Sequence, residues 1–228
     1  MINDYFDLEV DKVNAPKRPI PSGLVSPVEA IGLSVISALI GLAACFTISP
    51  FAFILGGIVW LIGFLYNWKF KQEGLLGNLM VAISVAGTFI LGGIVVGEPW
   101  NKTVWLFALT AFFVDLAEEI AGDAMDMEGD RKRDSKSIAI RMGRDAALRI
   151  SASLFVTVVL ISFIPYVLGW LGATYLLFIS VLGLSVLFFT GKLLKSQTPE
   201  EGRSSMRGIY LGILFGMLAF MITRFLFE

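Results

Sequence analysis

Two groups of aspartates in this sequence share one spacing. In each group, steps of three and then four residues separate the carboxylates. The members are Asp4, Asp7 and Asp11 in the first group and Asp123, Asp126 and Asp130 in the second. On a helix this spacing keeps the three carboxylates on one face. Two such charges repel by about 3 kcal/mol at about 6 Å and an effective dielectric near 20. The spacing therefore predicts bound cations, and carboxylate oxygens suit Mg²⁺. A solvated acidic loop is the alternative for either group alone.

Further polar residues accompany both groups. Asn3 adds an amide to the first group, and Glu119 lies four residues before Asp123 on the same expected face. Basic residues follow each group and also close an apolar run; they are Lys17 and Arg18, then Arg131, Lys132, Arg133 and Lys136, then Lys69 and Lys71. Cations beside Mg²⁺-binding carboxylates predict a polyphosphate site. Control of membrane topology and contact with anionic lipids are the alternative roles for basic residues.

The residue types that are missing exclude several classes of chemistry. The chain has no histidine, so Ser-His-Asp hydrolysis, haem ligation by histidine and His-type zinc sites are excluded. Its one cysteine, Cys45, lies in an apolar run, which excludes an intrachain disulfide and Cys-rich metal or iron–sulfur sites.

The elements that must position these residues are membrane helices. Of the 228 residues, 56% are hydrophobic and only 16% are charged, against about 25% in a typical soluble domain. We therefore expect an all-α fold, a polytopic transmembrane helical bundle forming a single transmembrane domain over residues 1–228. Seven spans are expected: Ser26–Ile48, Phe51–Asn67, Leu76–Gly97, Thr103–Ile120, Ala147–Leu168, Leu171–Gly191 and Ser205–Phe227.

Basic residues are distributed very unevenly between the two expected sides of the membrane. All of the 18 lysines and arginines except Lys102 and Arg224 fall on one side, together with both aspartate groups. This asymmetry predicts a multi-pass protein of the cell membrane whose charged side is cytoplasmic. The expected cytoplasmic segments are 1–25, 68–75, 121–146 and 192–204.

Three motifs resemble, in order along almost the whole chain, those of UbiA-type intramembrane prenyltransferases. N-D-Y-F-D-L-E-V-D, followed by P-K-R-P-I-P-S-G, resembles the first aspartate-rich motif, and D-A-M-D-M-E-G-D-R, followed by K-S-I-A-I-R-M-G, resembles the second. Y-N-W-K-F-K with G-L-L-G-N is similar to a loop that places a tyrosine and a lysine near the diphosphate. E-E-I-A-G-D-A-M-D-M-E-G-D-R is most similar to archaeal digeranylgeranylglyceryl phosphate synthases.

The resemblance implies an Mg²⁺-dependent enzyme. It would transfer a geranylgeranyl group from geranylgeranyl diphosphate to geranylgeranylglyceryl phosphate, releasing diphosphate, in archaeal ether-lipid synthesis. The implied partners are an isoprenyl diphosphate, a lipid-phosphate acceptor and the bilayer, without nucleic acid. The implied catalytic and metal-binding residues are Asp4, Asp7, Asp11, Asp123, Asp126 and Asp130. The implied substrate-binding residues are Asn3, Arg18, Tyr66, Lys69, Lys71 and Arg131.

One departure from the family's pattern concerns the beginning of the chain. The family normally has a transmembrane helix before the first motif, whereas here the motif begins at Asn3. We therefore expect an N-terminal family helix to be missing from this chain, together with its substrate contacts.

Other functions remain open at this stage. Within the family, the acceptor could be aromatic, of the quinone or porphyrin type. A membrane cation carrier is the non-enzyme alternative, which predicts ionisable residues at mid-membrane. Asp115, Glu118 and Glu119 fall inside one expected span, near its cytoplasmic end and not at mid-membrane, which argues against a carrier.

Overall fold

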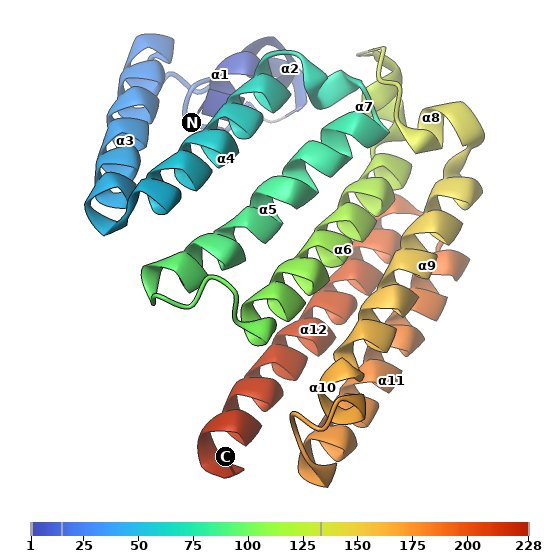
Figure 1. Ribbon diagram of the computed structural model, residues 1–228. Coiled ribbons are helices and arrows are strands. Elements are labelled where there is room, and N and C mark those ends of the chain that lie inside the picture. Colours follow the sequence, from blue (N-terminus) through green and yellow to red (C-terminus); the bar gives the residue numbers. More distant parts are fainter. Residues whose placement is uncertain (1, 15, 133, 228) are drawn as a thin grey trace.

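The computed structural model describes residues 2–14, 16–132 and 134–227, and the regular elements within these residues are all helical (Figure 1). In chain order they are α1 (Ile2–Phe6), α2 (Leu8–Asn14), α3 (Pro27–Ile48), α4 (Pro50–Trp68), η1 (Phe70–Gln72), α5 (Leu75–Val95), α6 (Lys102–Met125), α7 (Met127–Lys132), α8 (Ile138–Met142), α9 (Arg144–Ser162), α10 (Ile164–Val167), α11 (Ala173–Lys195) and α12 (Pro199–Phe227). The all-α prediction is thereby confirmed. Arg133, one of the predicted basic neighbours, lies outside the described residues.

The prediction of seven spans requires a correction. Within the described residues, six helical segments are long and apolar enough to cross a membrane: Pro27–Ile48, Pro50–Trp68, Leu75–Val95, Arg144–Val167, Ala173–Lys195 and Pro199–Thr223. The remaining predicted span, Thr103–Ile120, lies within α6. This helix is 24 residues long, but acidic side chains occupy the part of it that leads to Met125. It joins the bundle as a helix that carries charge, not as an apolar span.

Capping residues explain where the long helices begin. Ser26 and Glu29 form a capping box at the start of α3, in which each side chain bonds the backbone N–H of the other residue. Ser49 caps α4 in a similar way, accepting a hydrogen bond from the Ala52 N–H at 3.1 Å. Each cap precedes a proline at the first helical position, where the missing N–H costs nothing.

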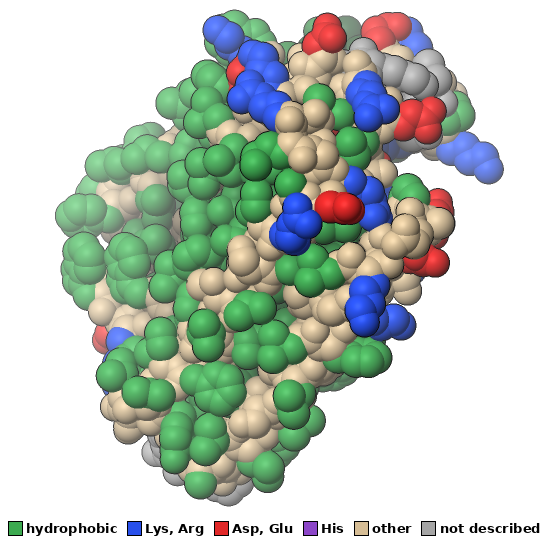
Figure 2. Space-filling model, turned by 90° about the vertical axis from the view of Figure 1, so that its right-hand side faces the viewer, with side chains coloured by type: hydrophobic (Ala, Val, Ile, Leu, Met, Phe, Trp, Pro, Cys, Tyr) green, Lys and Arg blue, Asp and Glu red, His purple; other side chains and the backbone are tan. Residues whose placement is uncertain are grey.

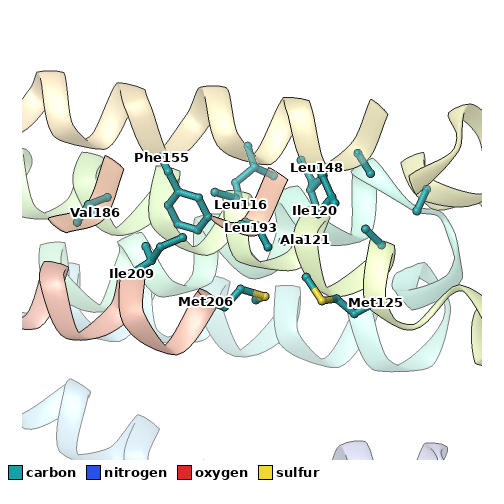
Figure 3. Close-up of a cluster of buried hydrophobic side chains, with 14 of the residues drawn as sticks. Leu116, Ile120, Ala121, Met125, Leu148, Phe155, Val186, Leu193, Met206 and Ile209 are labelled. Atoms are coloured by element: carbon teal, nitrogen blue, oxygen red, sulfur yellow. The ribbon is translucent and has the colours of Figure 1, made fainter. Parts of the chain in front are cut away.

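The core lies where α6, α9, α11 and α12 meet. Leu116 and Ile120 of α6 pack with Phe155 of α9, Leu193 of α11 and Ile209 of α12 (Figure 3). All five side chains are buried. This packing holds the charged part of α6 against α12, whereas α3 and α4 lie to one side of the bundle (Figure 1).

The two ends of the bundle differ in polarity. The short helices α1, α2, α7 and α8 gather at one end, and α10 lies at the other (Figure 1). Figure 2 shows charged side chains concentrated toward the end with the short helices, above a largely hydrophobic surface. The exposed hydrophobic side chains, such as Phe51, Val167 and Leu184, suit contact with lipid.

Candidate active site

A polar cavity of about 640 Å³ opens at the charged end of the bundle. It is lined from α1, α2, α4, η1, α5, α6, α7 and α12, so elements from both ends of the chain contribute to it. Nine predicted site residues line it: Asn3, Asp7, Asp11, Arg18, Tyr66, Lys71, Asp123, Asp126 and Asp130. The other three predicted site residues, Asp4, Lys69 and Arg131, are not among the lining residues. The fold thus brings both aspartate groups to one cavity.

The first acidic group reaches the cavity as a row along α1 and α2. The Asp7 N–H donates to the Asn3 carbonyl at 2.9 Å, and the Asp11 N–H donates to the Asp7 carbonyl at 2.8 Å. These bonds continue the helical spacing across the junction of the two short helices, so Asn3, Asp7 and Asp11 share one face. Asp4 lies beside this row, with its carboxylate 3.4 Å from Arg18 Nη1.

Two cations neutralise the buried carboxylates of this row. Lys71 Nζ donates to the Asp7 carboxylate and, at 2.9 Å, to the Asn3 amide oxygen. Arg18 Nη1 donates to Asp11 Oδ2 at 2.7 Å, and this bond raises the pKa of the guanidinium. A buried carboxylate without such a partner would be strongly destabilising. Lys71 and Arg18 therefore hold the first acidic group in place and also present positive charge to the cavity.

Lys71 is positioned by a loop that docks on the segment after α7. The Lys136 N–H donates to the Gln72 carbonyl at 2.8 Å, and Lys136 Nζ lies 2.7 and 2.8 Å from the two carboxylate oxygens of Glu73. This ion pair lowers the pKa of Glu73. Gly74 has a φ of +62°, and a Cβ at this position would lie 2.7 Å from the Lys136 carbonyl carbon. The close approach of the two loops thus requires glycine at residue 74.

The second acidic group lies on the last turns of α6 and on α7. Asp123 Oδ2 accepts a hydrogen bond from Asn78 Nδ2 at 2.9 Å, and Asn78 is buried on α5. Asp126 Oδ1 accepts one from Arg203 Nη2 of α12 at 2.6 Å. Each of these two aspartates is therefore oriented by a different neighbouring helix.

Several residues that line the cavity were not among the predicted site residues. They are Gln72, Asn78, Glu118, Ser135, Arg203 and Met206, with Gly122 and Gly129. Asn78 could have been predicted as a site residue, because a polar side chain inside an apolar span usually faces a partner or a functional site. Arg203 could not have been predicted in this way, since one arginine near the start of a helix resembles the many others that set membrane topology.

The donor set fits a divalent metal that is shared with a bound phosphate. Within the described residues, no three acidic side chains are grouped closely enough to hold a metal ion by themselves. However, five aspartates from the two groups line the same cavity, and all their donors are oxygens. Mg²⁺ is commonly bound by one or two carboxylates together with water and substrate phosphate oxygens. A site completed by substrate oxygens is consistent with both observations.

Comparison with known proteins finds one family. A model described as the UbiA prenyltransferase family matches residues 1–223. A digeranylgeranylglyceryl phosphate synthase of Methanopyrus kandleri is 34% identical over 222 residues, which cover 97% of this chain and 80% of that protein. A protein of the same name from Methanococcus maripaludis is 37% identical over 225 residues, covering 97% of this chain and 78% of the relative.

Solved structures resemble the whole bundle. One of them matches with a TM-score of 0.79 at 30% identity. It is described as giving structural and mechanistic insights into the biosynthesis of digeranylgeranylglyceryl phosphate synthase in membranes. It covers 97% of this chain and 78% of that chain. The apo structure of a UbiA homologue from Aeropyrum pernix K1 matches with a TM-score of 0.74 at 20% identity, covering 97% and 82%, and supports the fold alone.

Proposed function

Because this chain belongs to the UbiA prenyltransferase family, we propose that it transfers a geranylgeranyl group from geranylgeranyl diphosphate to geranylgeranylglyceryl phosphate. The product would be the doubly prenylated glyceryl phosphate of archaeal ether lipids. The observation that carries this proposal is the convergence of both aspartate groups, Lys71 and Arg18 on one cavity. The names of the similar synthases support the choice of substrates.

The reaction exchanges one carbon–oxygen bond for another. The bond between the allylic C1 of the donor and its diphosphate oxygen breaks, and both electrons leave with the diphosphate. The hydroxyl oxygen of the acceptor forms a new bond to C1, and its proton passes to a phosphate oxygen or to a carboxylate that lines the cavity. Because negative charge grows on the departing diphosphate, fixed positive charge beside it lowers the barrier.

We assign different residues of the chain to the diphosphate, the allylic cation and the metal. Lys71 and Arg18 are the side chains we assign to the donor diphosphate, since both project positive charge into the cavity from the first acidic group. Tyr66 lines the same cavity and is the aromatic side chain assigned to the allylic cation. The aspartates that line the cavity are the side chains that would hold the metal.

Members of this family use metal ions, and we assign Mg²⁺ here because every donor in the set is a hard oxygen ligand. When bound, the metal would supply positive charge to the diphosphate oxygens. The cavity lies at the charged end of the bundle, and the excess of basic residues there supports a cytoplasmic orientation. The lipid chains of the substrates would enter from the bilayer beside the apolar helices.

A prenyl-transfer assay in vesicles tests the proposal. The protein is given geranylgeranyl diphosphate and Mg²⁺ with either geranylgeranylglyceryl phosphate or an aromatic acceptor. We expect ether product from the glyceryl phosphate. Product from the aromatic acceptor alone would overturn the substrate assignment, and absence of transfer to any acceptor would overturn the activity.

A further inference from the structure

The cations that line the cavity are not equivalent. Among its lining residues the positively charged side chains are Arg18, Lys71 and Arg203. Arg18 and Lys71 both bond carboxylates of the first acidic group, on the side of α1 and α2. Arg203 comes from α12 and bonds Asp126 of the second group. The proposed reaction has two anionic substrates, a diphosphate and a phosphate monoester, and the cavity offers positive charge from two separate directions.

Arg203 retains donors for a ligand. Its one hydrogen bond within the described residues runs from Nη2 to Asp126, whereas a guanidinium carries five N–H donors. Half of the side chain, 49%, remains accessible. The bond to the Asp126 carboxylate already restricts the guanidinium. Binding of a ligand by the remaining N–H groups therefore costs little further side-chain freedom.

The helix that carries Arg203 also continues into apolar surface. Leu211, Leu214 and Leu218 of α12 are exposed, at spacings of three and four residues that place them along one stripe. An acceptor whose prenyl chain lies along this stripe has its polar end toward the start of α12. Arg203 lies eleven residues, about three turns, before Leu214, so it shares this side of α12 at the cavity end of the helix.

We propose that Arg203 is the specificity-determining residue for the phosphate of the lipid acceptor. In this assignment its guanidinium bridges Asp126 and the acceptor phosphate monoester, while Lys71 and Arg18 serve the donor diphosphate. The inference rests on the proposed function, because it assumes a phosphate-bearing acceptor. It adds the residue by which the site distinguishes that acceptor from the corresponding uncharged lipid alcohol.

The test compares Arg203→Gln with the unaltered protein on two acceptors, geranylgeranylglyceryl phosphate and the same lipid without its phosphate. Loss of one charge-assisted contact should reduce kcat/KM for the phosphate acceptor by about 10- to 100-fold, mainly through KM. The preference for the phosphate acceptor over the alcohol should fall by the same factor. The KM for geranylgeranyl diphosphate should stay unchanged. Arg203→Lys should restore part of the preference.

Arg149 supplies the matched control. It is exposed on α9 and is not among the residues that line the cavity, so Arg149→Gln should leave the acceptor preference unchanged. An unchanged preference in Arg203→Gln would overturn the inference. So would a loss confined to donor KM or Mg²⁺ activation, which would assign Arg203 to the donor side. If the unaltered protein does not use the phosphate acceptor, the proposed function itself fails, and that result is visible before any variant is measured.

Discussion

Substitution of Gly74 by alanine should disturb the donor side of the cavity without touching a cavity-lining side chain. Gly74 precedes α5 and has a φ of +62° with a ψ of −122°. Residues other than glycine rarely adopt this backbone conformation. An added Cβ would overlap the carbonyl oxygen of Lys136 and would lie 3.0 Å from the Ser137 Cα. Both obstacles are backbone atoms, so rotation of a side chain cannot relieve them.

The cost can be built from these two effects. The backbone conformation is expected to cost about 1–3 kcal/mol in alanine, and displacement of the packed backbone about 1–3 kcal/mol more. A total of about 2–6 kcal/mol equals or exceeds the net contribution of the few hydrogen bonds that dock this loop. We therefore expect the loop to separate from the segment at Lys136. Lys71 lies three residues before Gly74 and would lose its position against Asp7.

Two measurements check this chain of consequences. Thermal unfolding in detergent should show a lower midpoint for Gly74→Ala, and steady-state kinetics should show KM for geranylgeranyl diphosphate raised by about tenfold or more. Gly92→Ala is the control, because Gly92 lies in the same helix α5 with no atom within 4 Å of an added Cβ. It should be neutral or stabilising by up to about 1 kcal/mol. If Gly74→Ala keeps both its unfolding midpoint and its donor KM, the docking of this loop does not position Lys71.

Three further predictions concern the acidic groups and the packing around them. Asp7→Ala and Asp126→Ala should each abolish Mg²⁺-dependent turnover while membrane insertion persists, and near-normal rates in both would contradict the metal assignment. Removal of divalent metal with a chelator should stop product formation, and added Mg²⁺ should restore it; turnover that continues in the chelator argues against a metal requirement. Arg144→Ala removes bonds to the Ser196 carbonyl at 2.6 Å and hydroxyl at 3.0 Å, so unfolding free energy should fall by about 2 kcal/mol, with donor KM unchanged. An unaltered unfolding midpoint would show that these bonds contribute nothing to stability.

Much of the candidate site could be predicted from local sequence because helical spacing is a local property. Steps of three and four residues place Asp7 and Asp11 on one face wherever the helix lies, and they line the cavity together. The apolar runs likewise predicted the helices, since a backbone in lipid must satisfy its own hydrogen bonds. The predicted number of spans was wrong by one, because α6 combines an apolar run with the acidic residues of the site.

The sequence by itself determined that this is an all-helical membrane protein with two acidic groups of the same spacing, for which it predicts metal binding. Only the tertiary structure decided which side chains meet them. Asn78 on α5 and Arg203 on α12 bond two aspartates of the second group, and Lys71 on a docked loop bonds Asp7 of the first. Periodicity fixes which residues share the face of one helix, whereas the packing of distant helices decides which faces oppose each other. These partners, separated from their aspartates by tens of residues, are therefore visible only once the bundle has assembled.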